Sequence, residues 1–315
     1  MRLSPREAYP HLGCMNEAQQ PDYSAGFVAV VGLPNVGKST LVNALTGQPL
    51  SIVTARPQTT RQRVTAIYST GTHQAIFVDT PGLLEPRYLL HESMQHEARS
   101  GAVEADVLVY VVDLGYERSL AHAAEYAPPT GPRSLVCLNK ADLIDAGALR
   151  QAVVAFEASG HWEAVVATVA TTGEGLEALL GAILPMLPRS PPLYPLDDLA
   201  IAPVRFFVAE KIREVCFDEL GQELPYSLAI GIEEYREGSD PLYIAATIYV
   251  ERESQKGIVI GKGGRTVRQI GVRSRQSIES FVESRVYLDL RVKVLANWRK
   301  NPGKLKLLGY PVPHG

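Results

Sequence analysis

The segment Gly32–Ser39 (GLPNVGKS) constrains the fold most, because it matches the phosphate-loop pattern G-x-x-x-x-G-K-[ST] at every fixed position. It follows an apolar run, Phe27–Val31, and opens a helical pattern. We expect its glycines to turn backbone N–H groups toward phosphate oxygens. Lys38 should reach the β- and γ-phosphates, and the Ser39 hydroxyl should bind Mg²⁺. The other nucleotide contacts expected in or beside this loop are Gly32, Asn35, Val36, Gly37 and Thr40.

A second motif, Asp79-Thr80-Pro81-Gly82, stands where the apolar run Ala75–Val78 ends. A carboxylate at the carboxyl end of a strand lies where open sheets bind ligands. We therefore expect Asp79 to hold Mg²⁺ through water, opposite Ser39. The N–H of Gly82 should sense the γ-phosphate. The two motifs together predict a magnesium-dependent nucleoside triphosphate site.

A third motif, Asn139-Lys140-Ala141-Asp142, follows the apolar run Ser134–Leu138 and predicts which base is bound. The Asp142 carboxylate can accept two N–H bonds, from N1 and N2 of guanine, a pattern that adenine lacks. Asn139 and the stem of Lys140 would support and cover the base. Asp142 could instead be an ordinary helix N-cap, but the order and spacing of the motifs favour guanine.

Charge is unevenly distributed along the chain. Its 315 residues carry a net charge of −3 and an apolar fraction of 46%, which fits a globular protein and excludes a uniformly basic nucleic-acid binder. Residues 252–306, however, hold 14 Lys and Arg against 4 Asp and Glu, so a polyanion should bind late in the chain. Three widely spaced cysteines, Cys14, Cys137 and Cys216, indicate reduced thiols rather than a disulfide framework.

A proline-rich stretch, which is typical of a stiff extended linker, divides the chain into two patterned halves. The first half alternates short apolar strands with helices, which predicts an α/β domain whose mostly parallel sheet carries helices on both faces. The second predicts the order helix, strand, strand, helix, helix, strand. The boundaries that we expect are a flexible N-terminal extension at 1–25, a nucleotide domain at 26–187, a linker at 188–200, and a second domain with a basic tail at 201–315.

The expected strands and helices have explicit bounds. In the first half, the strands are 27–31, 64–69, 74–79, 107–112, 134–138 and 164–169, and the helices are near 39–45, 92–103, 119–127, 147–158 and 175–187. In the second half, helices are expected at 204–220 and 265–283, and strands at 226–235, 242–251 and 286–295.

A glycine-rich loop, Gly261-Lys262-Gly263-Gly264, lies between two expected helices of the basic segment. KH domains use a G-x-x-G loop to clamp single-stranded RNA, and the predicted element order is that of the type II KH fold. The motif alone fits an ordinary tight turn, so the element order carries the prediction. The residues expected to contact RNA are Ile258, Ile260, Gly261, Lys262, Gly263, Gly264, Arg265 and Arg268.

The three nucleotide motifs, in this order, resemble those of the translation-factor-related P-loop GTPases. Residues 51–61 resemble their switch I loop, in which a threonine closes on Mg²⁺ in the GTP state; Thr60 matches best, and Thr59 is the alternative. The fifth loop of this family is usually Ser-Ala-x-x-Gly-x-Gly. Here Ala170 is kept, which implies a contact between its N–H and guanine O6, whereas Val169 replaces the serine.

Leu83 stands where Ras-like enzymes place the glutamine that orients the attacking water. A leucine side chain cannot form a hydrogen bond to water. The chain therefore resembles the bacterial GTPases that have a hydrophobic residue at this position, some of which hold K⁺ with an asparagine at the position of Asn35. The resemblance implies slow hydrolysis and K⁺ beside the phosphates. The residues expected to act in hydrolysis are Lys38, Asn35, Thr60 and Gly82, and those expected to hold Mg²⁺ are Ser39, Thr60 and Asp79.

Residues 26–310 resemble bacterial GTPases of the Era family, in which a KH domain follows the GTPase domain. The shared segments include Gln58–Arg61, Glu210–Arg213, Glu223–Ser227 and Val259–Gly264. The resemblance implies binding to GTP and GDP, to the 3′ end of 16S ribosomal RNA and to the small ribosomal subunit, whose assembly and maturation the protein would serve. It also implies loose peripheral association with the inner membrane. We otherwise expect a cytoplasmic protein, because its thiols are expected to be reduced, and a monomer. No run approaches the ~18–20 apolar residues of a spanning helix.

Two other functions compete with an RNA-binding GTPase. A P-loop ATPase or small-molecule kinase with a chance basic tail would use the same phosphate loop, but Asn139–Asp142 argues against it. A pure RNA-binding module would have a degenerate nucleotide site and would function through its second domain alone. The intact Lys38, Ser39 and Asp79 argue against that function.

Overall fold

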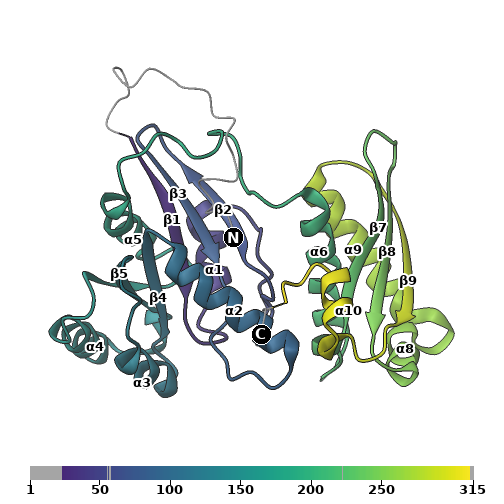
Figure 1. The fold of residues 1–315 in the computed structure, drawn as a ribbon, viewed down its shortest axis with the longest axis horizontal. Coiled ribbons are helices and arrows are strands. Elements are labelled where there is room, and N and C mark those ends of the chain that lie inside the picture. Colours follow the sequence, from purple (N-terminus) through teal and green to yellow (C-terminus); the bar gives the residue numbers. More distant parts are fainter. Residues whose placement is uncertain (1–22, 55, 57, 222, 313–315) are drawn as a thin grey trace.

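The first domain is built on a mostly parallel six-stranded sheet. The computed structural model describes residues 23–54, 56, 58–221 and 223–312. Within them the strand order is β2-β3-β1-β4-β5-β6, and only β2 runs antiparallel to its neighbour (Figure 1). The strands are β1 (Ser24–Val31), β2 (Val64–Ser69), β3 (His73–Asp79), β4 (Val107–Asp113), β5 (Arg133–Asn139) and β6 (Ala164–Thr168). Each strand lies within three residues of its predicted bounds.

Helices cover both faces of this sheet, as predicted, which is why its central strands are continuous apolar runs. On one face α1 (Lys38–Thr46) and α5 (Leu176–Ile183) pack against Val28, Val30 and Phe77. The other face is covered by α2 (Leu89–Glu104), α3 (Glu117–Glu125) and α4 (Ala146–Ala158). Short 3-10 turns, η1 (Ala141–Leu143) and η2 (Leu184–Met186), follow β5 and α5.

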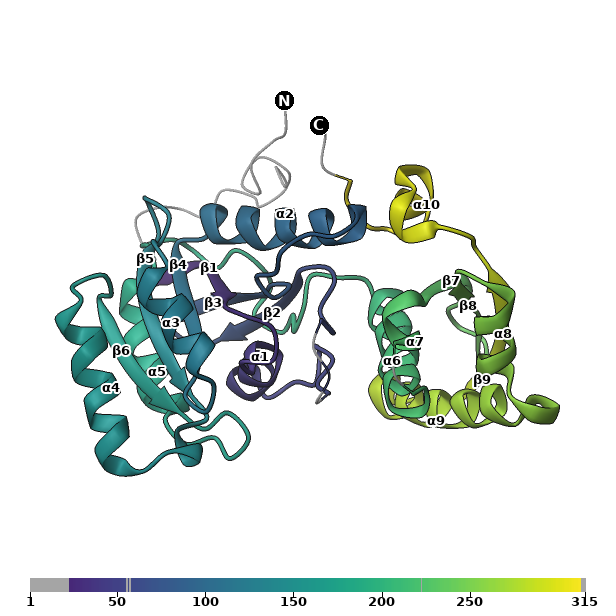
Figure 2. The ribbon, with the colours of Figure 1, turned by 90° about the horizontal axis from the view of Figure 1, so that it is seen from below.

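The second domain has the predicted order of elements around a three-stranded sheet, β7-β8-β9. β7 pairs antiparallel with β8, and β8 pairs parallel with β9. The two longest helices of this domain, α6 (Val204–Glu219) and α9 (Arg265–Val282), lie side by side next to this sheet (Figure 1 and Figure 2). The elements are α6 (Val204–Glu219), α7 (Leu224–Ser227), β7 (Ala229–Arg236), β8 (Leu242–Val250), α8 (Glu253–Ile260), η3 (Lys262–Gly264), α9 (Arg265–Val282) and β9 (Val286–Val294). The tail adds η4 (Trp298–Lys300) and α10 (Pro302–Leu307).

Two predicted boundaries were wrong. The strand expected from Tyr226 begins at Ala229, because Pro225 stands in the first turn of the short helix α7, where its fixed φ favours a helix. Ser24 and Ala25, assigned to the N-terminal extension, belong to β1 and pair with His73 and Gln74. The rest of that extension, residues 1–22, lies outside the described residues.

The predicted linker is fixed to the first domain for most of its length. The Gln74 side chain accepts from the N–H groups of Leu193 (2.8 Å) and Tyr194 (3.0 Å) and donates to the Tyr194 carbonyl (2.9 Å). Further along, the Ile67 N–H donates to the Leu199 carbonyl (2.9 Å). The linker therefore leaves the first domain only just before α6.

The C-terminal tail packs against the first domain. Trp298, Leu305 and Tyr310 form an apolar cluster with Leu90 and Met94 of α2. Figure 1 shows the end of the tail beside α2. No helix in the described part of the chain is both long and apolar enough to cross a membrane.

Candidate nucleotide site and RNA-binding loop

The phosphate loop lies at the carboxyl end of β1 and leads into α1, as the sequence predicts. Asn35 and Gly37 both have positive φ, 65° and 98°. A Cβ at Gly37 would lie 2.3 Å from Asn139 Nδ2, so only glycine fits at this position. The loop therefore keeps the backbone curvature that presents N–H groups to an anion ahead of the α1 N-terminus.

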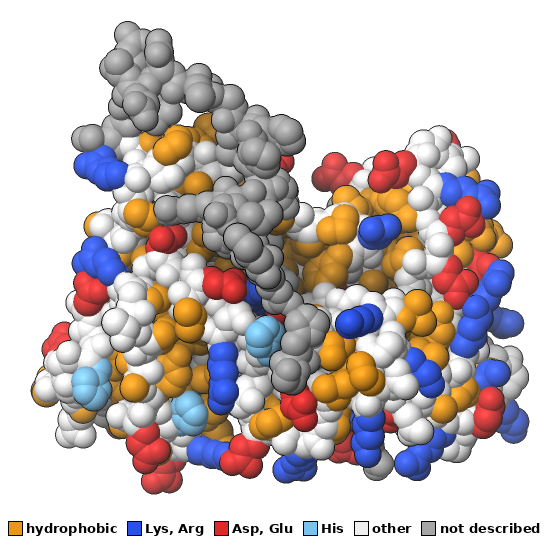
Figure 3. All heavy atoms as spheres, viewed as in Figure 1, with side chains coloured by type: hydrophobic (Ala, Val, Ile, Leu, Met, Phe, Trp, Pro, Cys, Tyr) orange, Lys and Arg blue, Asp and Glu red, His pale blue; other side chains and the backbone are white. Residues whose placement is uncertain are grey.

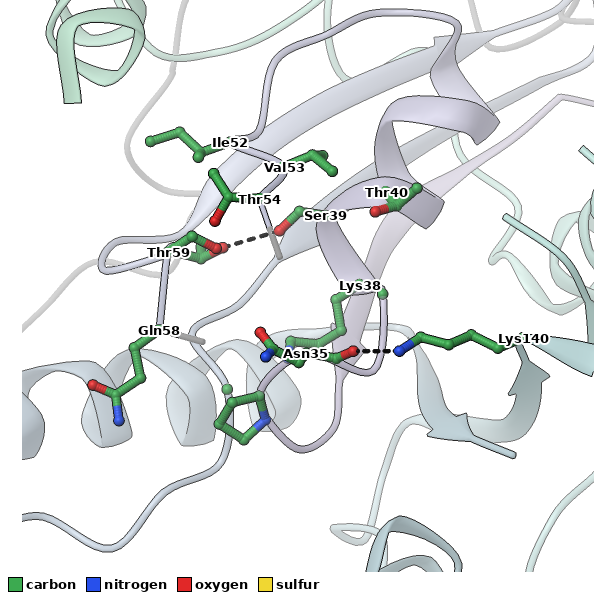
Figure 4. A pocket seen from close by; sticks show the side chains of 14 residues that line it. Asn35, Lys38, Ser39, Thr40, Ile52, Val53, Thr54, Gln58, Thr59 and Lys140 are labelled. Atoms are coloured by element: carbon green, nitrogen blue, oxygen red, sulfur yellow. Dashed lines mark hydrogen bonds between the residues drawn. The ribbon is translucent and has the colours of Figure 1, made fainter. Parts of the chain in front are cut away.

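Lys38 is buried within the phosphate loop. Its Nζ donates to the carbonyl oxygens of Gly32 (3.1 Å) and Leu33 (2.9 Å). Burial lowers the pKa of Lys38 to about 8, and the nearby Asp79 charge acts in the opposite direction. Lys38, Asn35 and Ser39 line a cavity of about 320 Å³ (Figure 4). Thr60 lines the same cavity.

Three oxygen-bearing side chains converge beside Lys38. The Ser39 hydroxyl donates to Asp79 Oδ2 (2.7 Å), and Thr60 Oγ1 lies 3.0 Å from Ser39 Oγ and 3.3 Å from Asp79 Oδ2. Burial raises the pKa of Asp79, against the hydrogen bond from Ser39 and the charge of Lys38. Asp79 Oδ1 is buried and has no partner among the described residues. A hard-oxygen donor set with a buried, unpaired carboxylate oxygen fits Mg²⁺.

Of the two candidate threonines, Thr60 makes the hydrogen bonds to Ser39 and Asp79. Thr59 also lines the cavity, but its carbonyl accepts from Arg213 in the second domain. Residues 55 and 57 of the predicted switch I loop lie outside the described residues.

Gly82 lies against the phosphate loop. A Cβ there would be 2.8 Å from Pro34 N, and the next residue, Leu83, donates its N–H to the Gly32 carbonyl (3.0 Å). Gly82 also lines the phosphate cavity. The Leu83 side chain packs against both cores of the first domain and offers no polar group.

The predicted base-binding residues surround a second cavity of about 140 Å³, which shares Gly37, Thr40 and Lys140 with the first. Asn139 is buried, and its Nδ2 donates to the Val36 carbonyl (2.9 Å). Lys140 Nζ donates to the Asn35 carbonyl (2.9 Å; Figure 4) and to Asp113 (2.6 Å). Asp142 is exposed at the rim. The two cavities are therefore contiguous, as a site for phosphates next to a base requires.

The Ala170 N–H, which we expect to face guanine O6, also donates to Asn139 Oδ1 (3.1 Å), because that oxygen lies beside the end of β6. Asn139 Oδ1 also accepts from Thr168 (3.1 Å). Thr168 and Asp113 were missed by the sequence analysis. Both stand at the carboxyl ends of strands, a position that could have identified them.

The glycine loop of the second domain joins α8 to α9. Gly261, Gly263 and Gly264 all have positive φ, and a Cβ at Gly261 would lie 2.2 Å from Thr266 Oγ1. Around Gly263 and Gly264 there is open space. The backbone is therefore free to be approached closely, in front of the positive N-terminus of α9.

Basic and apolar side chains flank this loop. Lys262, Arg265 and Arg268 are exposed and form no ion pair with the described residues. Ile258 is 59% exposed, which is high for a large apolar side chain, and Ile260 is partly buried. In Figure 3, Lys and Arg side chains are frequent on the side of this domain that carries α8 and β9. Such a surface suits single-stranded RNA, because cations attract its phosphates and an exposed isoleucine can contact its bases.

Comparisons with known proteins agree on both halves. Residues 27–140 match the family described as "50S ribosome-binding GTPase", and residues 223–299 match "KH domain". The chain is 38% identical to GTPase Era of Geotalea uraniireducens over 294 residues, which covers 92% of this chain and 99% of that protein. It is 41% identical to GTPase Era of Thermosipho melanesiensis over 278 residues, covering 87% and 93%.

Two solved structures resemble the whole chain. One is Era in complex with MgGDPNP and nucleotides 1506–1542 of 16S ribosomal RNA, and the other is a point variant of Aquifex aeolicus Era bound to GDP·AlF4⁻. Each has a TM-score of 0.86 and 35% identity, and covers 92% of this chain and 100% of the solved one. The resemblance therefore includes both domains.

Proposed function

Because the chain belongs to the Era family of GTPases, we propose that its hydrolysis of GTP switches the binding of single-stranded RNA at the 3′ end of 16S rRNA, in the assembly and maturation of the small ribosomal subunit. The observation that carries this proposal is the convergence of Ser39, Thr60 and Asp79 beside Lys38, in one chain with a KH domain. The Era structure that resembles this chain contains that RNA segment.

The nucleotide site is assigned as follows. Lys38 offers its ammonium to the β- and γ-phosphates, and Asp142 accepts from the guanine edge. Ser39, Thr60 and Asp79 hold Mg²⁺, which neutralises phosphate charge when bound. Thr60 and the Gly82 N–H sense the γ-phosphate, so their loops are held while it is present and released after hydrolysis. The remaining nucleotide contacts are Gly32, Asn35, Val36, Gly37, Thr40, Asn139, Lys140 and Ala170.

Hydrolysis by these residues alone is slow. Leu83 cannot orient water, and the site has no arginine aimed at the γ-phosphate among the residues lining its cavity. We propose that K⁺, held beside the phosphates by Asn35, supplies the missing positive charge. The left-handed backbone of Asn35 places this residue in the wall of the phosphate cavity.

The RNA site is assigned to the glycine loop and its flanks. Gly261–Gly264 approach the RNA backbone, while Lys262, Arg265 and Arg268 attract its phosphates. Ile258 and Ile260 lie under the bases. We further propose that the GTPase domain ends at 187, that 188–200 is the linker, and that the protein is a cytoplasmic monomer with peripheral association with the inner membrane. Sedimentation and vesicle flotation test the last two points.

Two binding measurements test the proposal. Calorimetry with Mg²⁺ should detect tight binding of GDP and GTP, and ATP should not displace them. An RNA of nucleotides 1506–1542 of 16S rRNA should bind more tightly in the presence of GDPNP than of GDP. Displacement of GDP by ATP would favour the ATPase alternative, and RNA binding that is indifferent to the nucleotide would contradict the switch.

A further inference from the structure

Two arginines cross between the domains in opposite directions at the loop that carries Thr60. Arg61 extends from the GTPase domain into the KH domain, and Arg213 extends from α6 of the KH domain back to the loop. Both are almost fully buried, with 3% and 1% of their surface exposed. Buried guanidinium groups are rare unless hydrogen bonds satisfy them, so their partners define what they do.

Arg61 occupies a site made of KH-domain carbonyls. Its Nη1 donates to Leu228 (2.7 Å), and its Nη2 donates to Pro225 (3.0 Å) and Tyr226 (3.2 Å). These carbonyls belong to α7 and to its C-cap residue, Leu228, and a helix C-terminus attracts a cation. The guanidinium also lies 5.7 Å from the centre of the Trp298 ring.

Arg213 holds the other side of Thr60. Its Nη2 donates to the carbonyl of Thr59 (2.5 Å), and Glu210, one turn earlier on α6, fixes the guanidinium through Nε (2.8 Å). The Arg213 guanidinium carbon lies over the Phe217 ring, 5.6 Å from the ring centre. Arg213 is thus oriented by its own helix before it reaches the GTPase domain.

Thr60 therefore stands between two residues that are both attached to the KH domain. Its hydroxyl lies 3.0 Å from Ser39 and 3.3 Å from Asp79, the groups assigned to Mg²⁺. A peptide segment of three residues cannot move its centre far while both flanks are held. The position of Thr60 is thus set from the KH side and from the nucleotide side at once.

We propose that Arg61 and Arg213 are positioning residues for GTP hydrolysis, which hold Thr60 over the magnesium site by anchoring its loop to the KH domain. The inference rests on the proposed role of Thr60. GDP has no γ-phosphate and does not require the closed loop, so the two arginines should favour GTP over GDP. By thermodynamic reciprocity, bound GTP should favour the docked KH domain.

The other nucleotide-sensing loop is also attached to the KH domain. Tyr88, at the start of α2, lies under Arg299 (4.8 Å to the ring centre), and its hydroxyl accepts a hydrogen bond from Arg299 Nη1 (3.3 Å). Ser93 on α2 donates to the Pro311 carbonyl (2.5 Å). The docked arrangement therefore involves the segments that follow both Thr60 and Gly82.

Full-length Arg213→Lys and Arg61→Lys variants test the proposal, since lysine keeps the charge but loses the planar fork of donors. Arg205→Lys is the matched control, because Arg205 is exposed on the same helix α6. The readouts are single-turnover hydrolysis at saturating GTP and Mg²⁺, affinities for GDP and GDPNP, and thermal unfolding. A split between the two affinities separates positioning from a general loss of structure.

We expect both Arg213→Lys and Arg61→Lys to lower the single-turnover rate and the GDPNP affinity by about 10-fold, within the usual range for coupled sites. GDP affinity should change less than about twofold, and the control should match the parent. If either of these two variants folds, hydrolyses GTP and discriminates GDPNP from GDP like the parent, the proposal is overturned. If one variant fails to unfold cooperatively, the other decides. A parent that binds no GTP contradicts the proposed function instead.

Discussion

The side-chain amide of Asn139 donates to the carbonyl oxygen of Val36 across 2.9 Å, which ties the base-recognition loop directly to the phosphate loop. The other end of the same amide accepts from Thr168 and from the Ala170 N–H. One buried residue therefore holds three ligand loops in a common geometry.

Replacing Asn139 by alanine should weaken GDP and GTP binding together, by about 10- to 100-fold, because several buried polar groups lose their partners at roughly 1–3 kcal/mol each. Equilibrium titration with both nucleotides measures this. An equal loss of affinity for GDP and GTP distinguishes Asn139 from Arg61 and Arg213, whose variants should lower mainly the affinity for the triphosphate. Unchanged affinity for both nucleotides would contradict the role assigned to this amide.

Asp142→Asn should shift the preference of the site from guanine toward xanthine nucleotides, because an amide reverses donor and acceptor at the base edge. GDP affinity should fall at least about 100-fold, given the cost of unpaired polar groups in a recognition site. Competition between GDP and XDP provides the measurement. Asp145→Asn is the matched control, since Asp145 caps α4 three residues away and asparagine caps equally well. A variant that still prefers guanine would refute the assignment.

Gly263→Asp should abolish measurable RNA binding, through a fall in RNA affinity of about 100-fold or more, and should leave GTP binding intact. No atom lies within 4 Å of a Cβ at this position, so the effect comes from a negative charge placed where phosphates approach. Gly238→Asp is the control: it also has positive φ and open space, but it lies in the turn between β7 and β8. Loss of RNA and GTP binding together would show that the two sites are not separable.

GTP turnover should be at least about 10-fold faster in KCl than in NaCl at equal ionic strength, because about 1.4 kcal/mol of added transition-state stabilisation gives that factor. Asn35→Ala should remove the difference in rate between the two salts. Steady-state phosphate release measures both. Equal rates in the two salts, with Asn35→Ala also neutral, would exclude K⁺ from the mechanism.

Acidification should destabilise the fold through His91. This imidazole is buried on α2, and its Nδ1 has no partner in the described structure. Burial, together with the charges of Arg299, Arg87 and Arg61, lowers its pKa to about 4. Since the unfolded chain binds this proton near pH 6.5 and the folded one does not, stability is present above that pH and is lost as the pH falls toward 4.

The loss should amount to about 1 kcal/mol between about pH 7 and pH 5, because solvent screening weakens the effect of the neighbouring charges. Urea unfolding of the parent and of His91→Phe at the two pH values measures it, and the variant should lose correspondingly less. His161→Phe, which changes an exposed histidine, is the control. Equal losses in all three proteins would show that His91 does not titrate in this way.

The sequence predicted the strands and helices well because these depend on local patterns. Apolar runs followed by glycine, aspartate or asparagine marked β1, β3 and β5, and the motifs at their ends lie at one edge of the sheet. The role of Arg61 could not be predicted, because its acceptors are backbone carbonyls more than 160 residues later, which carry no sequence signal. The same holds for the Gln74 contacts with the linker and for the hydrogen bond from the Ala170 N–H to Asn139.

The attachment of the linker to Gln74 and Ile67 limits how the KH domain can move. Ala200 is still paired with Ala66, and α6 begins at Val204, so the bend between the domains is confined to residues 201–203. Three extended residues span about 10 Å. A KH domain released from Arg61 therefore pivots about a short tether instead of drifting away. Reassociation is intramolecular, at high effective concentration. In the proposed switch, loss of the γ-phosphate therefore changes the orientation of the RNA-binding surface without separating the two domains.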